Sequence, residues 1–172
     1  EFDVYDKDDN GDTPIDIALK RGRYETSLIL EAFAKRGDIK LVKKLIKEHR
    51  FILDGFKGNR SNNKSLLHLA ATTGRLGIAK YLISKKAEVN YRDKEFETPL
   101  HCAIRSGHKD VALYLINSGA SLTVKNKSGH TPLFYAIESE NMSDLFSVCK
   151  DKLSGVKDDF LLHAIRKGRL EI

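Results

Sequence analysis

Histidine and cysteine are the side chains of this chain that metal binding or covalent catalysis would use first. The sequence contains six His and two Cys, and their spacing offers none of the close His and Cys pairs that a zinc site needs. Cys102 and Cys149 lie in separate parts of the chain, which favours free, buried or half-buried thiols in a reducing compartment. Neither a G-x-S-x-G nucleophile motif nor a phosphate-binding glycine loop occurs. We therefore expect no catalysis, no cofactor and no metal within these residues.

The segment Asp6–Asp12, which reads DKDDNGD, is the part of the chain most similar to a cation-binding loop. Its carboxylates suit calcium, but the loop lacks the Glu that an EF-hand places at its twelfth position. Its Asn-Gly pair is typical of a tight turn. We therefore interpret the segment as a backbone turn.

A fixed spacing between similar segments organises the rest of the chain. The Thr-Pro-Leu of Thr98–Leu100 returns 33 residues later at Thr131–Leu133. Ser65 opens a similar segment 33 residues before Thr98, and Thr13–Ile15 opens a further copy. Self-similarity at this period indicates a solenoid of small helical units, each of which packs on its neighbours because none buries a core alone.

Each well-formed unit predicts two helices followed by an exposed loop, which we call the finger. Thr98 is a typical N-cap, Pro99 suits the first position of a helix, and Gly107 ends that helix. Apolar residues at helical spacing then predict a second helix, which Gly119 closes. The finger follows over Ser121–His130, with Asn and Gly as its turn residues.

The same template describes the earlier units, with two departures. It places their second helices at Leu76–Ser84 and Ile39–Lys47. The spacing between Gly22 and Gly37 is too short to include a finger. We therefore expect Thr26–Arg36 to form one helix that directly follows Pro14–Arg21. The loop Phe51–Lys64 is about four residues longer than the template, and its apolar start is expected to pack beneath the neighbouring finger. The connection around Lys150–Asp158, in a later unit, is shortened as well. The array is therefore regular in its middle and irregular at both ends.

Three segments carry a family resemblance. They are TPLHCA at Thr98–Ala103, SGA at Ser118–Ala120 and NKSGHTPL at Asn126–Leu133. In these residues the chain resembles the ankyrin repeat family, which implies an all-α solenoid of helix-turn-helix units with protruding fingers, about five units in number. The resemblance further implies that His68 and His101 form hydrogen bonds between neighbouring units, a position that Phe134 takes in the next unit.

The resemblance extends over nearly the whole chain. We expect one array over residues 1–172, with units near 1–25, 26–64, 65–97, 98–130 and 131–157 and a partial unit at 158–172. Because the chain begins inside an expected finger, without Met, and stops after a first helix, we expect a fragment of a longer protein. No apolar run approaches the ~20 residues of a membrane span, and no signal peptide begins the chain. We expect an intracellular, cytoplasmic monomer.

The resemblance implies that partner proteins bind in a concave groove formed by the fingers and the exposed edges of the first helices. Phe96 stands where other fingers have Gly11 and Gly129, which places a large apolar side chain on an exposed loop. Tyr and Arg near it are residue types enriched at binding hot spots. We expect the partner to contact Tyr91, Arg92, Glu95, Phe96, Arg105, Lys125, Lys127, His130, Tyr135 and Glu138, with Leu69, Thr72, Lys94 and Cys102 on the same surface. The alternative is that these are ordinary surface residues.

Lysines gather on one face of the helix expected at Ile39–Lys47. Lys40, Lys43, Lys44 and Lys47 recur at helical spacing opposite its apolar residues, with Lys35, Arg36 and Arg50 nearby. We interpret this convex face as a solvated surface, and the alternative is contact with acidic protein, acidic lipid or nucleic acid. The net charge of +6 and the pI of 9.2 do not by themselves argue for nucleic acid. Aromatic residues for base stacking do not interleave with the lysines, so we expect no nucleic-acid partner.

These patterns together predict a non-catalytic module that binds a partner protein through the concave groove. The alternative is a targeting or substrate-presenting domain of a larger enzyme, such as an effector of an intracellular bacterium that acts in the host cytoplasm. Leu82 and Glu88–Asn90 also resemble the pattern that asparaginyl hydroxylases modify in ankyrin repeats. The other interpretation of Asn90 is a hydrogen bond across its own turn.

Overall fold

The computed structural model describes residues 7–13, 17, 32, 34, 36–48, 63–138 and 145 of the 172-residue chain. Regular secondary structure within them is helical, and no strand occurs there. The helices with described bounds are α3 (Ile39–Glu48), α4 (Leu66–Thr72), α5 (Leu76–Ser84), α6 (Pro99–Arg105), α7 (Lys109–Asn117) and α8 (Pro132–Glu138). No helix in this part of the chain is both long and apolar enough to span a bilayer.

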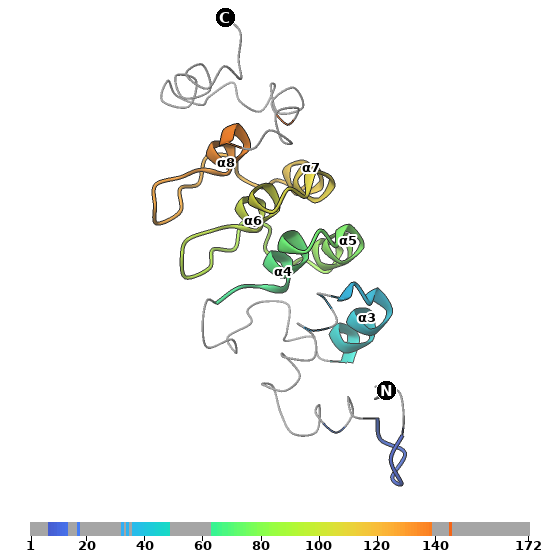
Figure 1. Ribbon diagram of the computed structural model, residues 1–172. Coiled ribbons are helices and arrows are strands. Elements are labelled where there is room, and N and C mark those ends of the chain that lie inside the picture. Colours follow the sequence, from blue (N-terminus) through green and yellow to red (C-terminus); the bar gives the residue numbers. More distant parts are fainter. Residues whose placement is uncertain are drawn as a thin grey trace, which may run out of the picture.

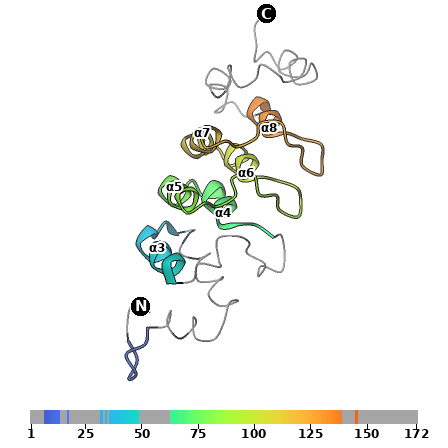
Figure 2. The same cartoon turned by 180° about the vertical axis from the view of Figure 1, so that it is seen from behind.

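The helices lie in two rows, with the fingers projecting beside one of them (Figure 1). α4, α6 and α8 form the row next to the fingers, whereas α3, α5 and α7 form the row behind it, as the reverse view also shows (Figure 2). α4 contacts α6 and α6 contacts α8 along the first row, while α5 contacts both α3 and α7 along the second. Each unit also pairs its own two helices, α4 with α5 and α6 with α7. The predicted all-α solenoid is therefore confirmed.

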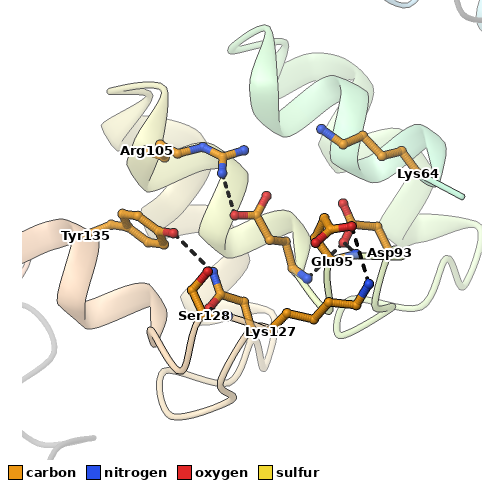
Figure 3. A pocket seen from close by; sticks show the side chains of 9 residues that line it. Lys64, Asp93, Glu95, Arg105, Lys127, Ser128 and Tyr135 are labelled. Carbon is orange, nitrogen blue, oxygen red and sulfur yellow. Dashed lines mark hydrogen bonds and ion pairs between the residues drawn. The ribbon is translucent and has the colours of Figure 1, made fainter. Parts of the chain in front are cut away.

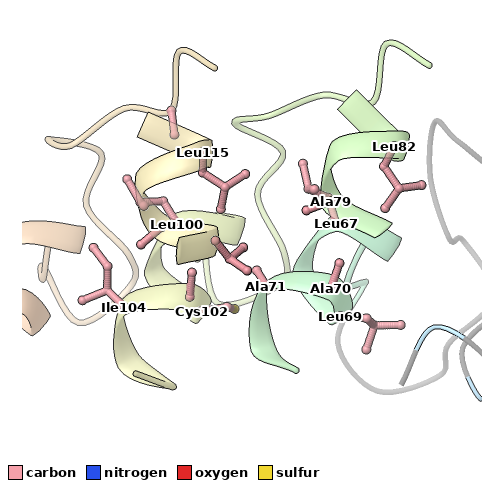
Figure 4. Packing of buried hydrophobic residues seen from close by; sticks show 14 of the residues in the cluster. Leu67, Leu69, Ala70, Ala71, Ala79, Leu82, Leu100, Cys102, Ile104 and Leu115 are labelled. Carbon is pink, nitrogen blue, oxygen red and sulfur yellow. The ribbon is translucent and has the colours of Figure 1, made fainter. Parts of the chain in front are cut away.

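Leucines at equivalent positions of three units stabilise the first row. Leu67, Leu100 and Leu133 follow one another at the 33-residue spacing, and each is at most 1% exposed. Ala71 and Cys102 are fully buried where α4 packs against α6, because small side chains let the two helices approach closely (Figure 4). Burial of one such leucine contributes roughly 1.5–3 kcal/mol. Repetition of these positions gives the array one continuous core.

The turn between the two helices of a unit requires glycine in the central repeat. Gly74 lies between α4 and α5 with a φ of +68°, a conformation that other residues rarely adopt. A Cβ atom at this position would lie 2.6 Å from the ring of His108, which belongs to the next unit. The Nε2 atom of that ring lies 3.0 Å from the carbonyl oxygen of Thr72. The glycine therefore admits both the turn and the neighbouring repeat.

The predicted helix bounds agree with the structure. α5 has the predicted bounds of Leu76–Ser84, and α3 extends one residue beyond the predicted Ile39–Lys47. Pro99 is the first residue of α6, and Thr98 before it has the extended backbone of an N-cap. In the helix predicted at 26–36, the described residues 32, 34 and 36 are helical. Outside the described residues lie the rest of that helix, most of Pro14–Arg21, the apolar start of the loop at Phe51, the connection around Lys150–Asp158, and Lys35, Arg50 and Cys149.

Replacement of Leu100 by Ala should lower the free energy of unfolding by about 2–5 kcal/mol, because it leaves a cavity in the middle of the stack. Urea unfolding followed by circular dichroism measures the loss. Leu113→Ala is the matched control, since Leu113 lies on α7 and is only partly buried. Its loss should be clearly smaller, and equal losses would contradict a core built on the stacked leucines.

Candidate partner-binding site

The three described finger turns share one internal hydrogen-bond pattern. Asp93 begins the turn of the second, and its Oδ1 atom accepts hydrogen bonds from the backbone N–H groups of Glu95 and Glu97, both at 2.9 Å. The same two bonds join Asn126 to Ser128 and His130 at 3.0 Å, and Asp8 to Asn10 and Asp12 at 2.9 Å. A short acceptor side chain thus fixes each turn. The predicted turn in Asp6–Asp12 is confirmed for its described residues.

His68 joins the start of α4 to the end of the finger in its own unit, directly before the next unit begins. Its Nδ1 atom accepts a hydrogen bond from the backbone N–H of Ser65 at 3.2 Å, and its Nε2 atom lies 3.0 Å from the carbonyl oxygen of Glu97. A backbone N–H can only donate, so Nδ1 is the acceptor and Nε2 carries the proton that is donated to the carbonyl. The imidazole is fully buried and has both ring nitrogens bonded.

His101 repeats this arrangement one unit later. Its Nδ1 atom accepts from the backbone N–H of Thr98 at 3.0 Å, and its Nε2 atom donates to the carbonyl oxygen of His130 at 3.2 Å. Glu97 and His130 are the last residues of the histidines' own units, so both bonds lie within a unit, and the prediction of hydrogen bonds between neighbouring units was wrong for these acceptors. In the third unit Phe134 takes this position, and its ring stacks on that of His130 with centroids 3.9 Å apart.

Phe96 has an uncommon backbone conformation at the tip of the finger. Its φ is +59°, at the position where Gly11 and Gly129 each have +78°. The side chain is 47% exposed, and it is the one large hydrophobic residue classed as exposed among the residues that the structure describes. The guanidinium of Arg92 lies 4.4 Å from the ring centroid and the ammonium of Lys127 lies 5.7 Å from it. The ring is thus positioned between two cations with part of its surface in solvent.

A polar hollow of about 330 Å³ lies between the two fingers and the ends of the first-row helices (Figure 3). It is lined by Lys64, Asp93, Glu95, Glu97, Arg105, Asn126, Lys127, Ser128 and Tyr135. Arg105 forms an ion pair with Glu97, whose side chain is only 7% exposed. Lys127 pairs with Glu95 across the two fingers at 3.4 Å. The Oη atom of Tyr135 accepts a hydrogen bond from Asn126 at 3.0 Å.

The structure brings together some of the predicted contact residues. Glu95, Arg105, Lys127 and Tyr135 line the hollow, and Arg92 and Phe96 lie beside it on the finger. Tyr91 is half-buried, with its Oη atom 2.9 Å from the amide nitrogen of Asn63. Lys125, His130 and Glu138 do not line the hollow.

The prediction that Leu69 and Cys102 lie on the binding surface was wrong. Both face the core, because the first-row helices pack closely there, and Cys102 is 0% exposed. Burial raises the pKa of the Cys102 thiol, which disfavours the reactive thiolate. The expectation of a free, buried thiol is confirmed for this residue.

Asn90 bonds to the next unit, and the interpretation of a bond across its own turn was wrong. Its Nδ2 atom donates to the carbonyl oxygen of Gly119 at 3.1 Å. Its Oδ1 atom accepts from the backbone N–H of Ser121 at 2.8 Å. The side chain thus connects one finger to the base of the following finger.

Sequence reasoning missed five residues that line the hollow: Lys64, Asp93, Glu97, Asn126 and Ser128. Asp93 and Asn126 had a signal, since they recur at the 33-residue spacing as short acceptor side chains. Lys64 had none, because it belongs to the preceding unit and reaches the hollow only through the stacking of the repeats.

The convex face of α3 has the predicted composition. Lys40, Lys43, Lys44 and Lys47 are all exposed there. Lys43 also lies over the ring of Tyr81 on α5, 5.5 Å from its centroid. α3 itself lies in the second row, with α5 and α7, whereas the fingers project beside the first row (Figure 1).

A family model for ankyrin repeats, in three copies, matches residues 30–126 and 92–155. The two matches overlap and together extend over residues 30–155, well over half of the 172-residue chain. No curated protein sequence matches the chain. The matched range includes α3 to α8, His68, His101 and the hollow.

The two buried histidines, His68 and His101, predict that stability falls in mild acid. Burial lowers the pKa of His68 and His101 in the folded state, whereas in the unfolded state each takes a proton near pH 6.5. Between these two pKa values the unfolded state binds more protons, so the contribution is fully present above pH 6.5 and is lost as pH falls. Each histidine changes the free energy of unfolding by at most about 1.4 kcal/mol per pH unit.

Urea unfolding at pH 7.5 and at lower pH, down to the start of carboxylate titration, measures this dependence. The double variant His68→Gln, His101→Gln can still donate and accept hydrogen bonds but does not titrate, so its pH dependence should be shallower. An identical dependence in wild type and variant would contradict the assignment of neutral, buried imidazoles.

Proposed function

We propose that this chain, which belongs to the ankyrin repeat family, binds a partner protein through the surface of its fingers. Ankyrin repeats are generally protein–protein interaction modules and are typically non-catalytic. The finger surface comprises the predicted contact residues Tyr91, Arg92, Glu95, Phe96, Arg105, Lys125, Lys127, His130, Tyr135 and Glu138. Phe96 is the observation that supports this choice most strongly.

The conformation of Phe96 is costly in the free protein. A non-glycine residue in the left-handed region costs about 1–2 kcal/mol relative to its preferred conformations. Cation–π contacts at exposed sites contribute about 0.5–1 kcal/mol each, so Arg92 and Lys127 at best offset that cost. Glycine occupies the equivalent position of two other fingers without this strain. A partner that buries the exposed part of the ring gives a physical reason for phenylalanine here.

Preorganisation of the fingers also supports binding at this surface. Asp93 and Asn126 fix the two finger turns from within, and His68 and His101 hold each finger to the preceding helix. A loop that is already ordered loses less conformational entropy on association. The fingers can therefore present Phe96 and the hollow as one formed surface.

Phe96→Gly should leave stability within about 1 kcal/mol of wild type, because relief of backbone strain offsets the lost ring contacts. The same change should weaken partner binding by about 1–3 kcal/mol. Proteins captured from cell lysate on the wild type are compared with those captured on the variant, and calorimetry measures the affinity of a protein that depends on Phe96. A variant that is equally stable and captures the same proteins equally well would contradict the finger surface as the site.

Reversal of Lys40, Lys43, Lys44 and Lys47 to Glu is the matched control on the convex face. It should mainly slow association and change its dependence on salt, because charges outside a contact steer the encounter. If this control abolished capture while Phe96→Gly had no effect, the convex face would be the binding site.

A further inference from the structure

We infer that the finger surface recognises an acidic segment of its partner, with an apolar side chain against Phe96 and a carboxylate in the neighbouring hollow. The inference rests on the proposed function and adds the chemistry of the ligand. It comes from the charges that the fingers leave unneutralised around one exposed aromatic ring, and from the position of the hollow beside it.

The carboxylates of the hollow are already committed to the protein. Asp93 is 3% exposed and accepts two backbone hydrogen bonds within its own turn. Glu97 is 5% exposed and pairs with Arg105. Glu95 is exposed but pairs with Lys127. Because Asp93 is buried and the other two are paired with cations, none of the three offers an exposed, unpaired carboxylate to a cationic ligand.

The cations near the fingers are in excess of these carboxylates. Arg92, Lys94 and Lys125 are exposed on the two fingers, and Lys64 lines the hollow from the preceding unit. Arg92 donates to the carbonyl oxygen of Lys125 at 3.0 Å and faces the Phe96 ring, so its own contacts neutralise no charge. Among the described residues, no carboxylate pairs with any of these four side chains. The surface is therefore positively charged, and a partner with acidic side chains complements it.

The hollow provides a position for one such acidic side chain. Lys64 and Arg105 both line it, and Arg105 places only one of its guanidinium nitrogens on Glu97. A guanidinium has five N–H donors, so Arg105 can bind a second carboxylate while the first pair remains. The guanidinium carbon of Arg105 lies 5.9 Å from the ring centroid of Tyr135 on α8, so this ring supports the Arg105 side chain. A carboxylate between Lys64 and Arg105 would thus have two cationic partners.

The geometry favours a protein segment over other anionic ligands. Phe96 is the one exposed large aromatic ring among the described residues, so successive bases of a single-stranded nucleic acid would find no series of rings to stack on. The hollow that would hold the carboxylate is recessed between two fingers, where the flat surface of a lipid bilayer has little access. An extended peptide can place an apolar side chain on Phe96 and an acidic one in the hollow, because its side chains project separately from a narrow backbone.

Selection from a displayed random-peptide library tests the inference directly. The immobilised wild-type chain is the bait, and a counter-selection on the Phe96→Gly, Lys64→Glu double variant removes peptides that bind elsewhere. We expect the enriched peptides to combine Asp or Glu with an aromatic or large aliphatic residue. A selected peptide, titrated by fluorescence anisotropy, should bind more weakly as salt rises.

Two single variants, each of which replaces a lysine by glutamate, test whether the carboxylate of the peptide binds in the hollow. Lys64→Glu should weaken a selected peptide by about tenfold or more, because it places a like charge against the bound carboxylate. Lys80→Glu is the matched control on the outer row, where Lys80 is exposed beside Tyr114, and should change the affinity less than about twofold. Equal effects of the two variants would overturn the assignment of the hollow.

The remaining outcomes separate the inference from the proposed function. Enriched peptides that are neutral or basic, yet depend on Phe96, would overturn the inference and leave the finger surface as the site. A library that yields no peptides dependent on Phe96 would contradict the proposed function itself. Binding to phosphatidylserine vesicles that depends on Phe96, without enrichment of acidic peptides, would overturn the inference in favour of a membrane.

Discussion

A buried imidazole that bonds at once to the start of its own helix and to the end of a finger is the interaction on which the rest of the array depends. His68 and His101 each accept a hydrogen bond at the start of their own helix and donate one to the carbonyl of the following finger. A buried polar group left unpaired costs about 1–3 kcal/mol, so both bonds must form together. Each finger is therefore held in place by the first helix of its own unit, and this order precedes any contact with a partner.

The stacking of helices and the placement of the fingers rest on different kinds of interaction. Leucines such as Leu67 and Leu100 stack along the first row through apolar contacts, which are not directional. The fingers instead depend on directional hydrogen bonds, from His68 to the end of the finger and from Asp93 within the turn. Because the turn is fixed by these bonds, Phe96 can be held at a strained φ with its ring partly in solvent. The proposed binding surface follows from this rigidity.

The repeat pattern allowed the fold to be predicted. The features that could not be predicted are those that depend on contacts with a neighbouring repeat. Pro99 and Ser84 mark helix ends that the structure reproduces, since capping and periodicity act within one unit. The exposed position of Phe96 in a left-handed turn also followed from a local comparison with Gly129. Contacts between units have no such local signal, so Asn90 was assigned to the wrong partner and Cys102 to the wrong surface. For the same reason Lys64 was not recognised in the hollow.

Nitrogen-15 NMR of the histidine rings at neutral pH is the most direct test of the hydrogen bonds that hold the fingers. The account predicts that His68 and His101 are both neutral with the proton on Nε2, and that a coupling across the hydrogen bond connects each Nε2 to the carbonyl of the next finger. That carbonyl belongs to Glu97 for His68 and to His130 for His101. Protonated rings, a proton on Nδ1, or rings that exchange freely between the two tautomers would contradict it.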